Sequence, residues 1–186
     1  YLLIGQGVIL AGATRELEAF VDQTGIPAGS TLLGLGALRE NHPLYMGFLG
    51  MHGNYACNKM INECDLLIAV GMRFDDRITG DTAKFARQAK VIHLEIDRAE
   101  INKIIPADVA IHADARQGLK ALTEKTDATD RSAWVNEFQK FKDEEYSKII
   151  EGDWFPKTGK IRMGEVIHLI SEKTNGEAVV VTDVGQ

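Results

Sequence analysis

The chain has 186 residues, of which 45% are hydrophobic, and its 21 basic and 27 acidic side chains give a formal net charge of −6. This length and apolar content suffice for a packed core and for somewhat more than one ordinary domain, and the acidic balance argues against a nucleic-acid partner, which requires clustered positive charge. Because no apolar run reaches the roughly 18 residues of a membrane helix and the start has no basic leader, we expect a cytoplasmic protein without a membrane partner.

Along the first 124 residues, apolar runs alternate with amphipathic segments in the rhythm of βαβ units, which predicts an α/β fold. Strands are expected where short apolar runs stop at glycine or polar residues, at residues 1–4, 26–30, 65–70, 91–96 and 109–112. Helices are expected at residues 13–24, 55–63, 82–88 and 115–123. Gly25 should end the first of these helices as a C-cap, and Asp114 should cap the start of the last one.

Two glycine-containing segments interrupt this pattern. Residues 5–12, with the sequence GQGVILAG, are predicted to form a turn between the first strand and the first helix. Residues 31–54 form a glycine-rich stretch that is too long for an ordinary connection. Loops of this length are usually functional or disordered.

From Lys125 onward the chain changes in character, because the polar segment TEKTDATDRS has no apolar periodicity and indicates a domain boundary. We expect one domain at residues 1–124, a linker with a long surface helix at 125–160 that becomes irregular from 151, and the start of another domain at 161–186. That last part should contain a helix at 162–174 and a strand at 178–181. Since the chain opens within a strand-like run without an initiator Met, we expect a piece of a longer protein.

The two cysteines, Cys57 and Cys64, have the spacing of neither a zinc-binding pair nor a disulfide framework. We therefore expect both to be reduced thiols that pack in the core. No metal site is expected in this chain.

The most informative segment is LLIAVGMRFDDRITG, in which a buried strand should end at Gly71 and be followed by charged residues. Open α/β sheets hold their ligands at the carboxyl ends of their strands. Arg73 and Arg77 could therefore bind phosphate oxygens while an aspartate such as Asp75 takes sugar hydroxyls. Mutual pairing of these arginines and aspartates at a surface turn is the alternative.

Three further groups of residues should lie at the same edge. Gly5 and Gly7 follow the first strand, where a backbone without side chains could approach a phosphate, although a tight structural turn explains them as well. The segment LGMHGN, residues 49–54, could bring its backbone and the Met51 thioether against a flat ring. In HLEID and the following strand, Glu95 and Asp114 could contact a ligand or only cap a helix.

Ordinary NAD binding is disfavoured by two features of the sequence. The glycine spacing after the first strand differs from the GxGxxG fingerprint of dinucleotide-binding folds. The acidic residue expected at the end of the second strand is also missing, since Ser30 and Thr31 stand there. A hydroxyl cannot clasp both ribose hydroxyls as a carboxylate does.

The segments LGMHGNYACN, DLLIAVGMRFDDRITG, HLEIDRAEINK and VVVTDVGQ closely resemble the large catalytic subunits of acetolactate synthases, also called acetohydroxyacid synthases. The resemblance covers essentially the whole chain. It implies that residues 1–124 form the middle of three α/β domains, a Rossmann-like, six-stranded parallel sheet flanked by helices that binds FAD in an extended pose. Residues 161–186 would then begin the domain that binds thiamine diphosphate.

The resemblance also implies which residues of this chain contact the flavin. The matching positions are Gly5, Gly7, Thr31, Leu32, Met51, His52, Gly53, Gly71, Arg73, Asp75, Arg77, Glu95, Ile96, Asp114 and Ala115. This chain departs from the family pattern at Gln6, which interrupts a run of glycines, and at Glu95, where aspartate is usual.

For the parent enzyme the resemblance implies condensation of two pyruvates, or of pyruvate with 2-oxobutyrate, with loss of carbon dioxide in branched-chain amino-acid biosynthesis. Thiamine diphosphate and Mg²⁺ would bind outside this segment, FAD would make no net redox contribution, and no catalytic residue is expected here. Homo-oligomers and a regulatory small subunit are the implied partners. The alternatives are a flavin-free catabolic acetolactate synthase, a glyoxylate carboligase relative, or a nucleotide-binding module without catalysis, whereas a sirtuin-like deacylase would need four zinc-binding cysteines.

Overall fold

The computed structural model describes residues 1–181. By its internal contacts the chain forms two compact units, residues 1–142 and 143–186. The first unit therefore extends past residue 124, where the sequence places a domain boundary, and ends within a helix. None of the helices in residues 1–181 is long and apolar enough to span a membrane.

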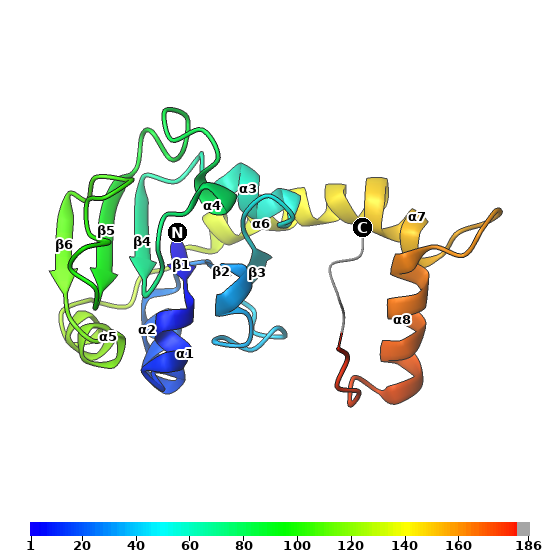
Figure 1. Cartoon of the computed structure of the whole chain (residues 1–186), viewed down its shortest axis with the longest axis horizontal. Coiled ribbons are helices and arrows are strands. Elements are labelled where there is room, and N and C mark those ends of the chain that lie inside the picture. The colour runs from blue at the N-terminus through cyan, green and yellow to red at the C-terminus, as the bar shows by residue number, and fades with distance from the viewer. Residues whose placement is uncertain (182–186) are drawn as a thin grey trace. The chain divides into compact units, whose positions relative to one another are not determined.

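The first unit is built on a six-stranded sheet with the order β3-β2-β1-β4-β5-β6, in which every pairing is parallel. Figure 1 shows the strands running in one direction between helices. The strands are β1 (Leu2–Ile4), β2 (Ala28–Ser30), β3 (Tyr45–Phe48), β4 (Leu66–Val70), β5 (Lys90–Glu95) and β6 (Val109–His112). The expected α/β fold with a six-stranded parallel sheet is confirmed.

Helices cover both faces of the sheet, which is why its central strands are apolar at every position. On one face, Leu2 and Ile4 of β1 pack with Leu17 of α2 (Thr14–Thr24) and Leu119 of α5 (Ala115–Thr123). Gly25 ends α2 in the left-handed conformation, with a φ of 65°, as predicted.

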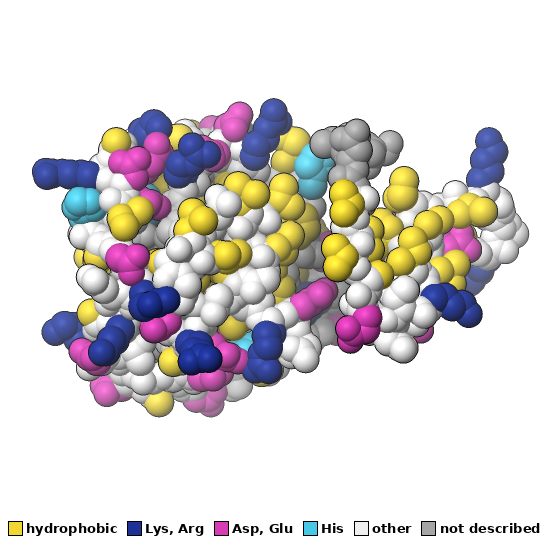
Figure 2. All heavy atoms as spheres, turned by 60° about the horizontal axis from the view of Figure 1, so that its bottom comes forward, with side chains coloured by type: hydrophobic (Ala, Val, Ile, Leu, Met, Phe, Trp, Pro, Cys, Tyr) yellow, Lys and Arg dark blue, Asp and Glu magenta, His cyan; other side chains and the backbone are white. Residues whose placement is uncertain are grey.

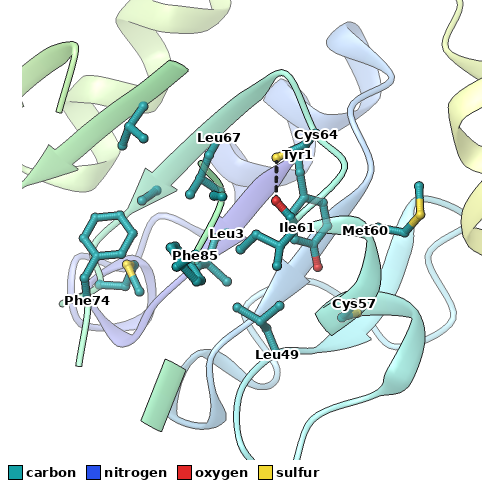
Figure 3. Close-up of a cluster of buried hydrophobic side chains, with 14 of the residues drawn as sticks. Tyr1, Leu3, Leu49, Cys57, Met60, Ile61, Cys64, Leu67, Phe74 and Phe85 are labelled. Carbon is teal, nitrogen blue, oxygen red and sulfur yellow. Dashed lines mark hydrogen bonds between the residues drawn. The ribbon is translucent and has the colours of Figure 1, made fainter. Parts of the chain in front are cut away.

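On the opposite face, Leu3 and Leu67 pack with Met60 of α3 (Tyr55–Met60) and Phe138 of α6 (Ser132–Glu145). Figure 3 shows this cluster, in which side chains from β1, α3 and β4 lie together with Leu49. Cys57 and Cys64 lie in it as buried free thiols, which confirms their expected place in the core.

Three predictions about local structure in the first unit are wrong. Residues 6–10 form a short helix, α1 (Gln6–Leu10), and not a turn. The long stretch 31–54 is not an irregular loop throughout, because it contains a 3₁₀ turn, η1 (Leu32–Gly34), and the edge strand β3. The glycine in the β3 sequence YMGF interrupts the apolar run by which a strand is predicted.

The predicted helix at 82–88 is a series of turns. Ala86 has a φ of 43° there, which a right-handed helix does not permit, and its N–H is held by Asn62 Oδ1 at 2.9 Å. The regular helix in this region is the earlier α4 (Asp76–Thr79), inside the charged motif.

In the second unit, a π-helical stretch, η2 (Tyr146–Ile150), and α7 (Glu151–Trp154) follow α6 along the chain. Residues 151–154 are therefore helical where the linker was expected to be irregular, whereas residues 155–160 are irregular, as predicted. The helix α8 (Met163–Thr174) confirms the one predicted at 162–174. The strand predicted at 178–181 does not form, because none of the described strands lies in this unit to pair with it. The segment TDVGQ, residues 182–186, lies outside the described residues.

Candidate functional site

The strand order changes direction at β1 and β4, the central pair from which the chain builds outward to both edges of the sheet. In open parallel sheets this is where a crevice forms beyond the carboxyl ends of the strands. Here the turn after β1 touches the turn after β4, since the N–H of Gly5 donates to the Val70 carbonyl at 2.9 Å and that of Gly7 to the Gly71 carbonyl at 2.8 Å. A Cβ atom at Gly7 would lie 2.7 Å from the Gly71 Cα. The glycines therefore have a structural role of their own.

All fifteen candidate residues lie at or shortly after the carboxyl end of a strand. They are Gly5 and Gly7 after β1, Thr31 and Leu32 after β2, Met51, His52 and Gly53 after β3, Gly71, Arg73, Asp75 and Arg77 after β4, Glu95 and Ile96 at the end of β5, and Asp114 and Ala115 after β6. Because all the strands are parallel, these positions share one edge of the sheet.

The charged motif after β4 is exposed and internally paired. Arg73 Nη2 lies 2.9 Å from Asp75 Oδ2, and both side chains are about half exposed. Arg77 Nη1 lies 3.7 Å from the Met51 thioether, while the Met51 N–H donates to the Arg77 carbonyl at 2.8 Å. The segments after β3 and β4 are thus joined, and their cationic and carboxylate groups remain accessible from solvent.

The carboxylates of Glu95 and Asp114 accept hydrogen bonds from the backbone. Glu95, which is buried, accepts from the N–H groups of Ile96 and Asp97 at 2.9 and 3.1 Å. Asp114 accepts from Arg116 N at 3.0 Å and so caps α5, as predicted.

The hydroxyl groups at the end of β2 are engaged within the protein. Ser30 Oγ and the Tyr45 hydroxyl lie 2.8 Å apart and are buried. Thr31 Oγ1 accepts the Gly34 N–H at 3.2 Å and begins η1. No carboxylate takes their place at this strand end.

Two hollows lie along the edge. One, of about 170 Å³, is lined by Gly7, Leu10, Gly71, Ile96 and Asp114 together with their neighbours. The other, of about 430 Å³, is open and lies between Met51, Arg77 and the residues that follow α4. Sequence reasoning missed Leu10, which belongs to the short helix that was predicted as a turn; its apolar VIL run was the available signal.

Large hydrophobic side chains are also exposed in the segments that follow β1, β2, β3 and β5. They are Ile9, Leu10, Leu32, Leu33, Leu35, Met51 and Ile96. Figure 2 turns this edge of the first unit toward the viewer and shows hydrophobic side chains on it, with charged side chains around them. Apolar surface that gathers at one edge in this way is typical of a binding surface.

Within residues 1–181, no three side chains of His, Cys, Asp or Glu are grouped so that they could hold a metal ion. The buried thiol of Cys64 is also unsuited to bind a metal, because burial raises its pKa and disfavours the thiolate.

Comparison with known proteins gives two findings. The family described as "Thiamine pyrophosphate enzyme, central domain" matches residues 1–122. The whole chain is also similar to proteins named acetolactate synthase large subunit from Lactococcus lactis, with 40% identity, and acetolactate synthase isozyme 2 large subunit from Escherichia coli, with 41% identity. A probable acetolactate synthase large subunit from Methanocaldococcus jannaschii is 39% identical. The chain spans 32% of the length of each of these three relatives.

Proposed function

The chain belongs to the thiamine pyrophosphate enzymes, whose central domain it contains at residues 1–122, and we propose that this domain binds FAD along the carboxyl edge of its sheet. The observation that carries the proposal is that all six strand ends bring candidate residues to one edge. An elongated dinucleotide needs such a row of contacts, because its two ring systems, sugars and phosphates lie far apart.

The side chains at this edge suit the chemistry of FAD. Arg73 and Arg77 can bind the diphosphate, and Asp75 can accept hydrogen bonds from hydroxyl groups. Leu10 and Ile96 line the small hollow with apolar surface that a ring could cover. The absence of a side chain at Gly7 lets a ligand approach the backbone closely, even though the amide itself is already bonded.

The remaining candidates extend this row in both directions. Thr31 and Leu32 lie beside Met51, His52 and Gly53 on the β3 side of the sheet, and Glu95, Asp114 and Ala115 lie on the β6 side. We assign the second group to the adenosine end, following the resemblance to acetolactate synthases. The deeply placed Glu95 would act by holding the Ile96 backbone against the ligand.

For the whole protein we propose the activity of an acetolactate synthase large subunit. Two pyruvates, or pyruvate and 2-oxobutyrate, would be condensed with release of carbon dioxide in branched-chain amino-acid biosynthesis. Thiamine diphosphate, which would be held with Mg²⁺ outside this segment, would supply the electron sink for the carbanion. The division at residues 124 and 160, homo-oligomer formation, a regulatory small subunit and a cytoplasmic location belong to the same proposal.

The flavin proposal is tested by titrating the 186-residue chain with FAD and following flavin fluorescence. We expect saturable but weak binding, with a dissociation constant above about 1 μM, or less than about 8 kcal/mol of binding free energy, because other domains would complete the pocket. Arg73→Gln should weaken binding about tenfold, or ~1.4 kcal/mol. Lys140→Gln on α6 removes the same charge away from the edge and should leave affinity unchanged.

Two results would contradict the flavin proposal: no saturable binding, or an equal loss of affinity in both variants. Flavin that remains tightly bound through purification would contradict the expectation that other domains contribute to the pocket. Flavin absorbance in the purified full-length enzyme would separate this branch from the flavin-free relatives.

We further propose that the chain by itself forms no acetolactate. The family match is to the central domain, and the chain corresponds to about a third of its relatives. Incubation with pyruvate, thiamine diphosphate and Mg²⁺ should therefore give no product above a blank without protein. Acetolactate formed in proportion to the amount of chain would overturn this proposal.

A further inference from the structure

His93 lies in the middle of β5 and has no exposed surface, although imidazole is polar. The residues registered beside it are alanines, Ala69 in β4 and Ala110 in β6. Their small side chains leave space in which the imidazole can lie across the sheet. The ring therefore reaches the turn that follows β4.

The imidazole makes one hydrogen bond and leaves its other nitrogen without a partner. His93 Nε2 lies 2.9 Å from the Met72 carbonyl oxygen, and since a carbonyl only accepts, Nε2 carries the hydrogen. Nδ1 is then a bare acceptor, buried and unpaired among the described residues. An unpaired buried polar atom costs free energy, and an apolar side chain would avoid that cost. The bond from Nε2 is thus the physical reason for a histidine here.

The turn that accepts this bond carries the charged groups of the candidate site. Residues 72–75 lie between β4 and α4 in neither helix nor strand. Met72 and Phe74 are buried, whereas Arg73 and Asp75 between and after them are accessible. The Phe74 ring also packs edge-on against His93, with 5.0 Å between ring centroids.

We propose that His93 is a positioning residue that holds Met72 and Phe74 inward and thereby fixes Arg73 and Asp75 outward at the ligand edge. This role in ligand binding rests on the proposed FAD site. The hold on the turn itself is a property of the free protein. It predicts that Nε2 of His93 carries a hydrogen, and that loss of this donor loosens the turn more than it loosens the sheet.

The first test needs no flavin. In ¹H–¹⁵N spectra of the imidazole we expect the Nε2–H form in the 186-residue chain. In His93→Leu, amide hydrogen exchange at Ile78 and Thr79, whose N–H groups donate to the Asp75 carbonyl at 2.9 and 3.0 Å, should accelerate about tenfold relative to β4. His93→Gln, whose side-chain amide can donate to the same carbonyl, should restore slow exchange. Val91→Ala truncates a buried side chain at the start of the same strand and should leave the ratio unchanged.

The second test measures FAD affinity in the same variants. His93→Leu should weaken binding about tenfold, and His93→Gln should remain within about threefold of the parent chain. If the parent chain does not bind FAD, the proposed function fails, while the exchange ratios still decide the role of His93. An Nδ1–H form, or equal effects of His93→Leu and Val91→Ala on exchange, would overturn the inference.

Discussion

At the end of β4, Gly71 adopts a φ of +58°, and a Cβ atom built on it would lie 2.7 Å from the Gly7 Cα. The position therefore excludes side chains for two separate reasons, the left-handed backbone and the contact with the turn after β1. This contact sets how closely the two central strand ends approach. The hollow lined by Gly7 and Ile96 lies directly beyond it.

Gly71→Ala should consequently destabilise the first unit by more than backbone strain alone. Gly36 also has a positive φ, of 84°, but nothing lies within 4 Å of a Cβ built there. Gly36→Ala should therefore cost about 1–2 kcal/mol from strain, and Gly71→Ala about 1–3 kcal/mol more from the steric clash. Urea unfolding followed by circular dichroism measures both. Equal losses in the two variants would show that the turns separate easily.

Other single residues differ in how well the sequence could predict them. Gly25 and Asp114 were found because caps are local, depending on a residue type beside a helix end. The hydrogen bond from His93 to Met72 joins residues that are 21 positions apart, and no sequence spacing predicts it. The Arg73–Asp75 pair was foreseen as an alternative to ligand binding, and the structure contains it.

Helices and strands, too, were predicted correctly where their own sequence determines them and were missed where contacts with distant segments do. The strand β4 was predicted because its apolar run is uninterrupted, and the ends of five strands with their candidate residues followed from that pattern. The edge strand β3 contains glycine and was missed, since its pairing with β2 decides its structure. The helix predicted at 82–88 does not form, because the Ala86 N–H donates to Asn62 Oδ1, on a segment distant in sequence, and not to a helical carbonyl. The common edge of the site was therefore predictable, whereas the turns around it were not.

The edge strand β6 is held to β5 by a charged clamp, in which the Asp108 carboxylate just before β6 binds Lys90 and Val91 of β5. Asp108 accepts the Val91 N–H at 2.9 Å and pairs with Lys90 at 2.9 Å. The backbone hydrogen bond, more than the lysine, holds the pKa of Asp108 below its ordinary value of 3.8. Because the pKa is depressed in the folded state, the contribution is complete above 3.8 and is lost as pH falls through the folded pKa.

Asp108→Asn should therefore flatten the acid side of the stability curve. Its side-chain oxygen can still accept the Val91 N–H but carries no charge, so the variant should be somewhat less stable than the parent chain at neutral pH and approach it as Asp108 of the parent becomes protonated. Urea midpoints measured from about pH 6 to about pH 3 should fall less steeply than in the parent chain. Asp97→Asn is the matched control, because that carboxylate accepts only the nearby Ala99 N–H. Parallel curves for Asp108→Asn and the parent chain would refute the clamp.

The helix α6 contributes to the core of the first unit through Phe138, which is fully buried. Its ring stacks on Tyr1 with centroids 5.3 Å apart and meets Trp134 edge-on. Although α6 lies in the segment expected as a linker, it thus covers β1.

Phe138→Ala should lower the unfolding free energy of the first unit by about 3–5 kcal/mol, the usual cost of removing a buried phenylalanine. Phe155→Ala deletes the same atoms from a half-exposed side chain of the second unit and should leave the first unit's transition in place. Amide exchange of β1 and β4 in urea gives the stability of the first unit directly. A loss below about 1 kcal/mol in Phe138→Ala would mean that α6 is dispensable to the core.

At the scale of the whole chain, the two units differ in what they bury. The first contains two clusters of buried side chains, one on each face of the sheet. In the second, none of residues 143–181 is buried, and Val166, Ile167, Leu169 and Ile170 of α8 are exposed. Since burial of apolar surface is the main source of folding free energy, the second unit should have a much smaller free energy of unfolding than the first.

Each unit contains one tryptophan, Trp134 in the first and Trp154 in the second, so their unfolding can be followed separately. Trp154 packs face to face with His168, at 4.6 Å between centroids, and this contact should disappear when α7 and α8 separate. In Trp134→Phe, which retains Trp154, the fluorescence midpoint in urea should therefore be lower than in Trp154→Phe, which retains Trp134. Circular dichroism of both variants serves as the control, because the transition of the sheet should occur at the midpoint reported by Trp134. Coincident fluorescence curves would show that residues 143–181 fold with the sheet as one cooperative unit.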